Sequence, residues 1–256
     1  MLVSVIMPTY NCGKFIAKSI DSVLAQTIDD WELLIVDDCS TDDTEAVLRP
    51  YLEKYENIHY SRLSQNSGPA VARTEAIRLA TGKYVAFLDS DDLWAPDKLQ
   101  KQLAFMQRNG VDFSCTAYQC MDEDGNDLHL VFTPPEKTDY RKCIRLSNPI
   151  GNLTVIYDQE HLGKFAVPMI KKRNDFALWL QILKKTEYCY GMPDVVSTYR
   201  MGRSGSVSSR KLKQAKYHWQ LYHEIEKHGV LRSAYELGCW VFVKGTGIGI
   251  NKKHTQ

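Results

Sequence analysis

Runs of apolar and β-branched residues alternate with amphipathic stretches along the first hundred residues of the chain. The runs predict strands and the stretches between them predict helices, an alternation that is typical of a parallel sheet with helices on its faces. The run at 84–88 is apolar throughout, as expected of a strand at the centre of such a sheet. The predicted strands are 3–7, 33–36, 58–60 and 84–88, and the predicted helices are 15–25, 42–55 and 69–80.

Beyond residue 95 the alternation is less regular. A strong helix is predicted from Asp175, because apolar residues from Phe176 to Leu183 follow the i, i+3, i+4, i+7 spacing of a buried face. Asn174 is well placed as the N-cap of that helix. Other predicted elements are a helix at 98–109, extended segments at 113–121 and 153–157, a turn at 124–126, and a basic helix from 210 to about 228.

The length of the chain limits the number of domains. A chain of 256 residues and 29.3 kDa can bury one substantial core, whereas two independent domains would be a tight fit. We expect one domain at 1–205, with halves at 1–95 and 96–205, and a C-terminal helical extension at 206–256. In that extension the apolar stretch from Trp240 to Val243 leaves three alternatives open, which are burial in the core, contact with a second subunit and contact with a membrane.

Charge and cysteine content narrow the class of protein. With 32 basic and 31 acidic residues the formal net charge is +1, so no global field favours DNA or RNA as a partner. Seven scattered cysteines without a CxxC pair disfavour a disulfide framework or a zinc site and indicate a reducing cytosol. The N-terminus lacks the pattern of a signal peptide, and no stretch reaches the roughly 20 apolar residues that span a bilayer.

Polar residues follow four of the predicted strands, at the ends where open α/β sheets bind their ligands. The chain has no GxGxxG after the first strand and no GxxxxGK[ST], which counts against a dinucleotide or P-loop site. The residues at these four ends include Pro8, Thr9, Tyr10, Asn11, Asp37, Asp38, Asn66, Asp89, Ser90, Asp91 and Asp92.

Three carboxylates lie within four residues, at Asp89, Asp91 and Asp92, and they repel one another unless a cation or buried protons offset the charge. A divalent ion is the simpler solution, because hard oxygen ligands suit Mg²⁺ or Mn²⁺, which leave positions for substrate phosphates. Such an ion neutralises charge on a departing diphosphate. The alternative is that Asp91 or Asp92 only caps the next turn.

Four segments, in this order, resemble the family 2 glycosyltransferases: VSVIMPTYN at 3–11, VDDCSTDDT at 36–44, NSGPAVARTEAI at 66–77 and GKYVAFLDSDD at 82–92. The resemblance implies the GT-A fold, a Rossmann-like α/β sandwich with a mostly parallel central sheet, here followed by the helical extension. It also implies metal-dependent transfer of a sugar from a nucleotide diphosphate donor to an acceptor hydroxyl. Residues 1–95 would then form the nucleotide-sugar half and 96–205 the acceptor half.

The same resemblance implies roles for individual residues. Asp38 would face the base, where a carboxylate that accepts from the uracil imide N–H would favour UDP, and Asp91 would bind the Mn²⁺ or Mg²⁺. Asp89 would lie near the ribose and Arg73 near the nucleotide or donor sugar. The alternatives are packing for Tyr10, a helix cap for Asp38 and a surface ion pair for Arg73. The residues implied to bind the nucleotide sugar are Pro8, Thr9, Tyr10, Asn11, Asp38, Asn66, Arg73, Asp89, Ser90, Asp91 and Arg203.

Asp175 lies in the segment KRNDFALW at 172–179, which resembles the acceptor-side motif of the family, with Asn174 in place of the usual glutamate. The aspartate of that motif is the implied general base, which takes the proton of the acceptor hydroxyl as it attacks the anomeric carbon. A position in the first helical turn favours the ionised form, although an acid at a helix start is also common without any catalytic role. One base and no argued nucleophile predict a single displacement with inversion.

The acceptor implied by the resemblance is a saccharide or lipid-linked saccharide of a bacterial surface polysaccharide, at the inner face of the membrane. Basic residues from Arg200 to Lys216 surround a serine-rich loop with Arg203, and they would close over a diphosphate, rest on an anionic membrane or form a solvated helix face. Two other functions stay open. A sugar nucleotidyltransferase would need a glycine- and arginine-rich loop where this chain has 8–11, and a non-catalytic nucleotide-sugar binding module would release no nucleotide diphosphate.

Overall fold

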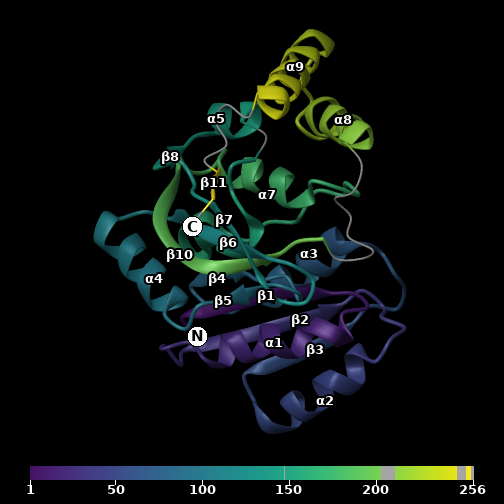
Figure 1. Cartoon of the computed structure of the whole chain (residues 1–256), viewed down its shortest axis with the longest axis vertical. Helices are drawn as coiled ribbons and strands as arrows, with labels where there is room; N and C mark the ends of the chain where they lie inside the picture. The colour runs from purple at the N-terminus through teal and green to yellow at the C-terminus, as the bar shows by residue number, and fades with distance from the viewer. Residues whose placement is uncertain (147, 203–210, 247–251, 255–256) are drawn as a thin grey trace.

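A computed structural model describes residues 1–146, 148–202, 211–246 and 252–254 of the chain. Figure 1 shows one mixed sheet through the middle of the molecule, with β1–β3 near one end of the long axis and α8 and α9 at the other. The strand order is β11-β7-β6-β9-β4-β1-β2-β3, and β10 pairs with β5, β6 and β8.

The N-terminal part of the sheet is parallel, as the alternating pattern predicts. Its strands are β1 (Val3–Thr9), β2 (Trp31–Asp37), β3 (Ile58–Arg62) and β4 (Tyr84–Phe87), and the connecting helices are α1 (Gly13–Leu24), α2 (Thr44–Lys54) and α3 (Pro69–Leu79).

Alternate residues of β1 belong to two hydrophobic clusters, because successive side chains of a strand point to opposite faces of the sheet. Val5 and Met7 pack in the cluster that contains Phe15 of α1, whereas Ile6 packs in the cluster that contains Ala76 of α3. Helices therefore cover both faces of the parallel strands. Because the strands are parallel, their carboxyl ends meet at one edge of the sheet.

The second part of the chain extends the same sheet with strands that are mostly antiparallel. β10 pairs with β5 of the first half and with β6 of the second, so the two halves share one sheet. The domain boundaries at 95 and 205 stay predictions. The elements are β5 (Leu93–Trp94), α4 (Lys98–Asn109), β6 (Phe113–Met121), β7 (Asp127–Phe132), β8 (Lys137–Thr138), α5 (Tyr140–Arg145), η1 (Asn152–Thr154), β9 (Ile156–Asp158), α6 (Gln159–Leu162), α7 (Asn174–Ile182) and β10 (Cys189–Arg200).

Two local predictions in this part were wrong. The extended segment expected at 153–157 is a 3-10 turn, η1, followed by the short strand β9, and the hydroxyl of Thr154 closes the turn by donating to the carbonyl of Gly151 at 2.7 Å. Asn174 is the first residue of α7 and does not cap it, because its side-chain oxygen accepts from the guanidinium of Arg73. A charge-assisted bond to another helix has replaced the local cap.

The C-terminal part is helical, and a helical extension is what the sequence predicts there. α8 (Lys211–Gln220) continues into a π-helical turn, η2 (Leu221–Ile225), and α9 (Val230–Thr246) follows, before β11 (Lys252–His254) pairs with β7. Arg210, the expected first residue of the basic helix, lies outside the described residues. In the part of the chain that the structure describes, no helix has the length and apolarity needed to cross a membrane.

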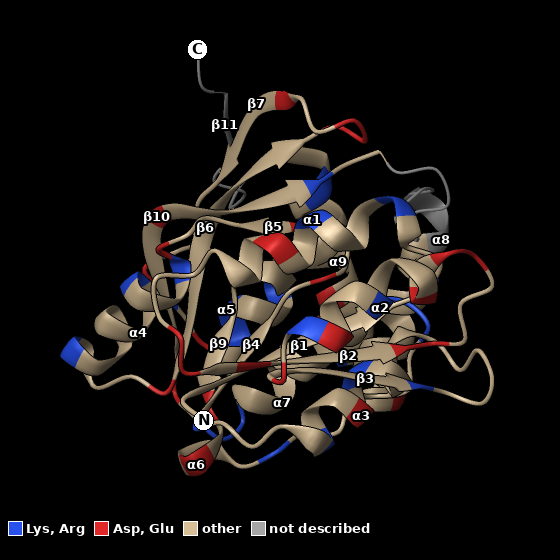
Figure 2. Cartoon of the chain, turned by 90° about the horizontal axis from the view of Figure 1, so that it is seen from below, with Lys and Arg blue, Asp and Glu red and all other residues tan. Residues whose placement is uncertain are grey.

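Charged residues of both signs are interspersed along the elements seen in Figure 2, in keeping with the net charge of +1. No single-sign field therefore dominates this view of the molecule, and local clusters carry the electrostatic argument.

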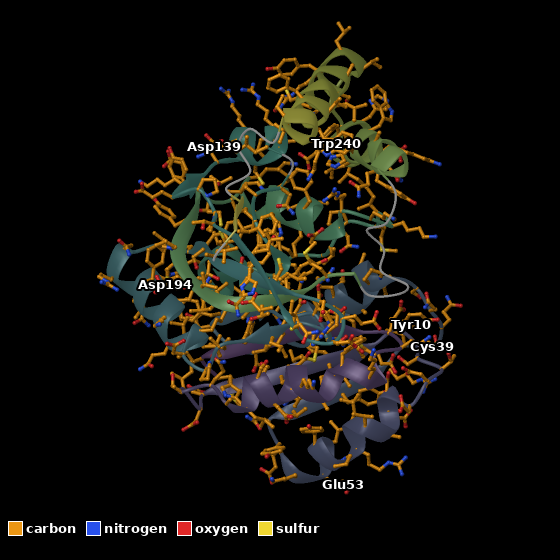
Figure 3. All side chains as sticks on the ribbon, viewed as in Figure 1. Tyr10, Cys39, Glu53, Asp139, Asp194 and Trp240 are labelled. Atoms are coloured by element: carbon orange, nitrogen blue, oxygen red, sulfur yellow. The ribbon has the colours of Figure 1, made fainter. Side chains whose placement is uncertain are left out.

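His218 of α8 forms the centre of the contact between the C-terminal helices and the rest of the chain. Its ring is 0% exposed and lies 4.5 Å from the ring of Trp240 on α9 and 6.1 Å from that of Phe176 on α7, measured between centroids. Figure 3 shows Trp240 where α9 meets the body of the molecule. Burial, with a smaller effect of the charges of Arg173 and Lys244, lowers the pKa of His218 to about 2.

We expect acid to weaken the folded state through His218. Its imidazole is neutral when folded but binds a proton when unfolded below a pKa of about 6.5, so its contribution is complete above that pH and falls as pH decreases. The loss is about 1.4 kcal/mol per pH unit, or about 2 kcal/mol at pH 5. Urea unfolding at pH 7 and pH 5 measures it. His218→Phe should reduce the pH dependence, whereas His129→Phe, at an exposed histidine, should leave it as in the unmodified protein; equal pH dependence in both variants would contradict the assignment.

Candidate active site

One cleft of about 960 Å³ lies at the carboxyl ends of the parallel strands. It is open on the side of Tyr10, whose side chain is 44% exposed, so packing alone does not explain this residue. Asp175, from the start of α7, lines the same cleft as Asp91. Of the residues predicted from the sequence, the cleft is lined by Pro8, Thr9, Tyr10, Asp38, Asn66, Arg73, Asp89, Ser90, Asp91 and Asp175.

Asp38 holds the loop that closes one side of the cleft. Its two carboxylate oxygens accept from the backbone N–H groups of Ser67 at 2.6 Å and Gly68 at 2.8 Å. Gly68 adopts φ 90°, a conformation that other L-residues rarely take, and this turns its N–H toward Asp38 just before α3 begins. Asp38 is thus neither a helix cap nor a free surface carboxylate. Its contact with a nucleotide base stays a prediction.

Arg73 connects the two halves of the site. It is 5% exposed, donates to a carboxylate oxygen of Asp89 at 2.8 Å and also donates to the side-chain oxygen of Asn174. The surface ion pair considered for Arg73 is therefore a partly buried one, in which the guanidinium is enclosed and the side chain of Asp89 is 32% exposed. Because Asn174 precedes Asp175 directly, the guanidinium fixes the start of α7 against residues 89–92 after β4, the acidic loop.

The acidic loop contains one carboxyl group that differs from its neighbours. Asp92 is 1% exposed, and burial, with the charges of Asp91 and Asp89, raises its pKa well above the usual range. Its carboxyl accepts from the backbone N–H of Arg200 at 2.9 Å, and the Arg200 guanidinium donates to the carbonyl of Asp91. The raised pKa favours the protonated form of Asp92, which would relieve charge repulsion in the loop. Arg200, 4% exposed, is a buried support of the loop and no part of an exposed basic surface.

Asp91 fits a site for a hard divalent cation. Its carboxylate lines the cleft and is half-buried, while Asp89 beside it is engaged by Arg73. One carboxylate with room for phosphate oxygens is the arrangement in which Mg²⁺ and Mn²⁺ are commonly bound.

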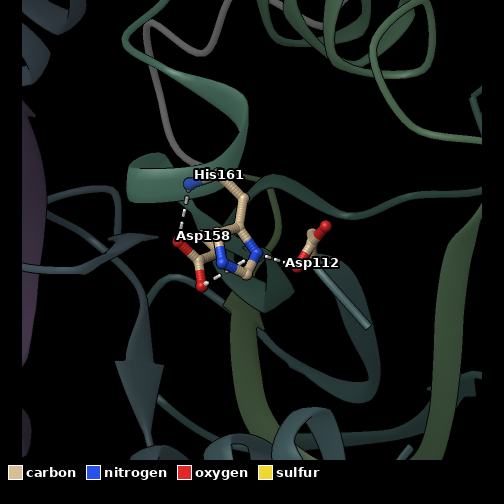
Figure 4. Close-up of side chains that lie close together, drawn as sticks. All are labelled: Asp112, Asp158 and His161. Atoms are coloured by element: carbon tan, nitrogen blue, oxygen red, sulfur yellow. Dashed lines mark hydrogen bonds and ion pairs between the residues drawn. The ribbon is translucent and has the colours of Figure 1, made fainter. Parts of the chain in front are cut away.

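A different group of side chains has ligand atoms close enough together for a metal. Among the described residues, Asp112, Asp158 and His161 have theirs within 4.8 Å of one another (Figure 4). The hydrogen bond that His161 donates to the carboxylate of Asp112, with the charges of Asp158 and Asp112, raises the pKa of His161. Lys83 approaches Asp158 at 3.6 Å. Asp158 pairs with the first residue of β4, at the opposite end of the strand from the acidic loop. We therefore assign the triad to ion pairing at the far edge of the sheet.

A second cavity, of about 350 Å³, adjoins the cleft and shares Asp89, Asn152, Arg173, Asp175 and Tyr199 with it. The amide of Asn148 lies 3.5 Å from a carboxylate oxygen of Asp175. Both side-chain polar atoms of Asn152 are buried and without a hydrogen-bond partner among the described residues, and so is the hydroxyl of Thr9 in the cleft. Unsatisfied buried polar atoms are costly, so these groups are candidates for contact with a bound substrate.

The wall of the smaller cavity carries an aromatic pair and two cations. The rings of Tyr118 and Phe132 stack with centroids 5.1 Å apart, and both residues line the cavity. Arg173, the residue before α7 and two residues before Asp175, has φ 66°, an unusual value for a non-glycine residue. The side chain of Lys244 is exposed as a whole, but its ammonium group is partly desolvated. This desolvation, with a smaller effect of repulsion from Arg173, lowers the pKa of Lys244. Two neighbouring cations favour an anionic ligand.

One predicted site residue, Asn11, is not part of the cleft lining, and another lies outside the described residues. The side chain of Asn11 accepts from the backbone N–H of Thr41 at 2.8 Å, and its own N–H donates to Ser40, so it joins the loops after β1 and β2. Arg203 and the serine-rich loop lie outside the described residues. Conversely, the sequence did not indicate Asn148, Asn152 or the aromatic pair, because each comes from a segment without a local motif.

The sequence model described as "Glycosyl transferase family 2" matches residues 4–166. The chain is 43% identical over 252 residues to the "Putative teichuronic acid biosynthesis glycosyltransferase TuaG" of Bacillus subtilis, covering 98% of this chain and 97% of that protein. It is 36% identical over 254 residues to the "UDP-Glc:alpha-D-GlcNAc-diphosphoundecaprenol beta-1,3-glucosyltransferase WfgD" of Escherichia coli, covering 99% and 95%.

The fold is also found in solved structures. S. aureus TarS 1-349 in complex with UDP-GlcNAc matches with a TM-score of 0.73 and 23% identity over 94% of this chain and 72% of that one. The mannosyltransferase PcManGT of Pyrobaculum calidifontis, in complex with GDP-Man and Mn²⁺, matches with a TM-score of 0.63 and 21% identity, covering 96% and 75%. The predicted α/β fold of GT-A type is thereby confirmed. The matching sequence model and the two relatives, which this chain covers almost completely, show that the chain belongs to glycosyl transferase family 2.

Proposed function

We propose that this protein transfers a sugar, with inversion, from a UDP-sugar to a hydroxyl group of a lipid-linked acceptor in the synthesis of a surface polysaccharide. The observation that supports this most is that Asp91 and Asp175 line one cleft, so a single sugar can lie between a diphosphate site and a base. On separate surfaces these two carboxylates could not act on the same bond.

The donor half of the cleft would hold the nucleotide and its diphosphate. Asp38 and the loop that it fixes would contact the base. Thr9 would donate its hydroxyl, which has no hydrogen-bond partner among the described residues, to the donor. Asp91 would hold the Mn²⁺ or Mg²⁺, which when bound supplies positive charge to the diphosphate leaving group. Arg73 would keep Asp89 at the ribose side of the cleft.

The acceptor half would activate and orient the attacking hydroxyl. Asp175 would take its proton as the oxygen forms a bond to the anomeric carbon and the bond to the diphosphate breaks. Asn152, which lines both cavities, would hydrogen-bond to the sugar between them, and the Tyr118–Phe132 pair would support the acceptor ring. One displacement from the face opposite the leaving group converts an α-linked donor into a β-linked product.

A diphosphate-linked acceptor accounts for the cations of the smaller cavity. WfgD is named for transfer to GlcNAc-diphosphoundecaprenol, and TuaG for teichuronic acid biosynthesis. Arg173 and Lys244, which line the cavity beyond Asp175, would face the acceptor diphosphate. Basic side chains placed in this way select an anionic acceptor over a neutral sugar.

The proposal predicts transfer with inversion. The protein is incubated with UDP-glucose or another UDP-sugar, Mn²⁺ and a GlcNAc-diphosphate lipid, and both UDP release and product formation are followed. We expect a β-linked product by NMR, and at least tenfold faster transfer than to a GlcNAc glycoside without phosphate, because each lost charge-assisted contact costs about 1.5–3 kcal/mol. A product with retained configuration would overturn the single displacement. Donor binding without any UDP release would favour the non-catalytic binding module.

A further inference from the structure

Helix α9 carries apolar side chains on the side that faces away from the rest of the chain. Leu231 is 89% exposed, Tyr235 56% and Phe242 58%. Their spacing of four and seven residues places them on one side of the helix, whereas Ser233 and Trp240, on the other side, are buried. Of eleven exposed large hydrophobic residues in the described chain, five lie between 230 and 242, a concentration that indicates an interaction surface.

The charges around this apolar side are basic. The only acidic residue of α9, Glu236, is buried and paired with His228 and Arg232. Helix α5 packs beside α9, and the guanidinium of Arg145 lies 5.7 Å from the centre of the Tyr235 ring. All the exposed charged residues of α5 and α9 are Arg or Lys, namely Arg141, Lys142, Arg145, Arg232 and Lys244.

We infer that this surface, the α9 patch, docks on an anionic lipid bilayer. The α9 patch consists of Leu231, Tyr235 and Phe242 with the basic residues Arg141, Lys142, Arg145 and Arg232. Its apolar side chains would enter the headgroup region, as those of an interfacial helix do, while the arginines and lysines bind acidic headgroups. The apolar side chains require a partner with an apolar interior, and the basic residues beside them require that its surface be negatively charged. An anionic membrane surface meets both conditions.

The position of α9 connects this surface to the acceptor cavity. Figure 1 shows α9 at the end of the long axis, away from β1–β3, and Lys244 near its C-terminal end lines the cavity that contains Asp175. Docking through α9 therefore brings this cavity toward the membrane surface, where the diphosphate of a lipid-linked acceptor lies. This last step rests on the proposed function; docking itself does not.

Vesicle binding tests the docking surface directly. The full chain is sedimented with vesicles of phosphatidylcholine alone or with about one third phosphatidylglycerol. We expect binding to the anionic vesicles that weakens with salt, because screening reduces attraction to the headgroups. Leu231→Ser/Phe242→Ser should bind at least tenfold more weakly, and Arg141→Gln/Lys142→Gln should lose the preference for anionic lipid. The matched control is Leu128→Ser/Val195→Ser, at two exposed apolar residues outside the patch, which should bind as the unmodified protein does.

Three outcomes would overturn docking: no binding of the unmodified chain to anionic vesicles, equal binding by the patch and control variants, or a dimer in light scattering that Leu231→Ser/Phe242→Ser dissociates. The last result would assign the patch to a second copy of the chain. Circular dichroism melting shows whether each variant is folded. Donor hydrolysis in the absence of lipid should be unchanged in the patch variant, so loss of vesicle binding with normal hydrolysis separates this inference from the proposed function.

Discussion

Asp175→Asn is expected to lower the turnover number by about a thousandfold while donor binding changes less than about twofold. The amide keeps the size and nearly the shape of the carboxylate but cannot take the proton of the acceptor hydroxyl. A thousandfold loss corresponds to about 4 kcal/mol in the activation barrier. Transfer rates at saturating donor and calorimetric titration of UDP with Mn²⁺ measure the two quantities separately.

Asp194→Asn is the matched control for this substitution. Asp194 is an exposed residue of β10, and Figure 3 shows it well away from Tyr10 at the cleft. The control removes the same charge with the same change of shape, so its turnover should be normal. If Asp175→Asn retained most of the activity of this control, the base would have to be another group, and the displacement mechanism would need to be revised.

The sequence predicted the donor side of the site better than the acceptor side, for a topological reason. Parallel strands bring their carboxyl ends to one edge, so Tyr10, Asp38 and Asp91, each just after a strand, could be expected to meet. Asn152 and the Tyr118–Phe132 pair reach the second cavity through η1 and the antiparallel pairing of β6 with β7. No short motif contains that pairing, and the sequence therefore gave no signal for these residues.

The errors in local structure also have physical causes. The apolar segment 153–157 is too short for periodicity to distinguish a strand from a turn, and a hydroxyl contact to Gly151 decides in favour of the turn at its start. Asn174 has the side chain of a good N-cap, but Arg73 reaches it from α3, more than a hundred residues away in sequence. In both places tertiary contacts override a local preference that the sequence shows correctly.

The same substitution is expected to have a large effect on activity at Asp91 and a small one at the neighbouring Asp92. Asp91→Asn should lower kcat/KM by about a hundredfold and weaken the Mn²⁺-dependent part of UDP binding, because an amide is a poorer ligand for a hard cation. Asp92→Asn should retain activity within about threefold. Burial and the charges of its neighbours raise the pKa of Asp92 and so favour its neutral form, which an amide resembles, and the amide oxygen can still accept from Arg200.

Titration of UDP in the presence and absence of Mn²⁺, together with steady-state transfer rates, distinguishes the two variants. Because both substitutions are chemically identical and lie in adjacent positions, general damage to the loop would affect both to a similar degree. Normal metal-dependent binding by Asp91→Asn would remove Asp91 from the proposed metal site. A severe loss in Asp92→Asn alone would show that the loop needs the charged form of the buried carboxyl, and would contradict the assignment of Asp92 as a neutral group.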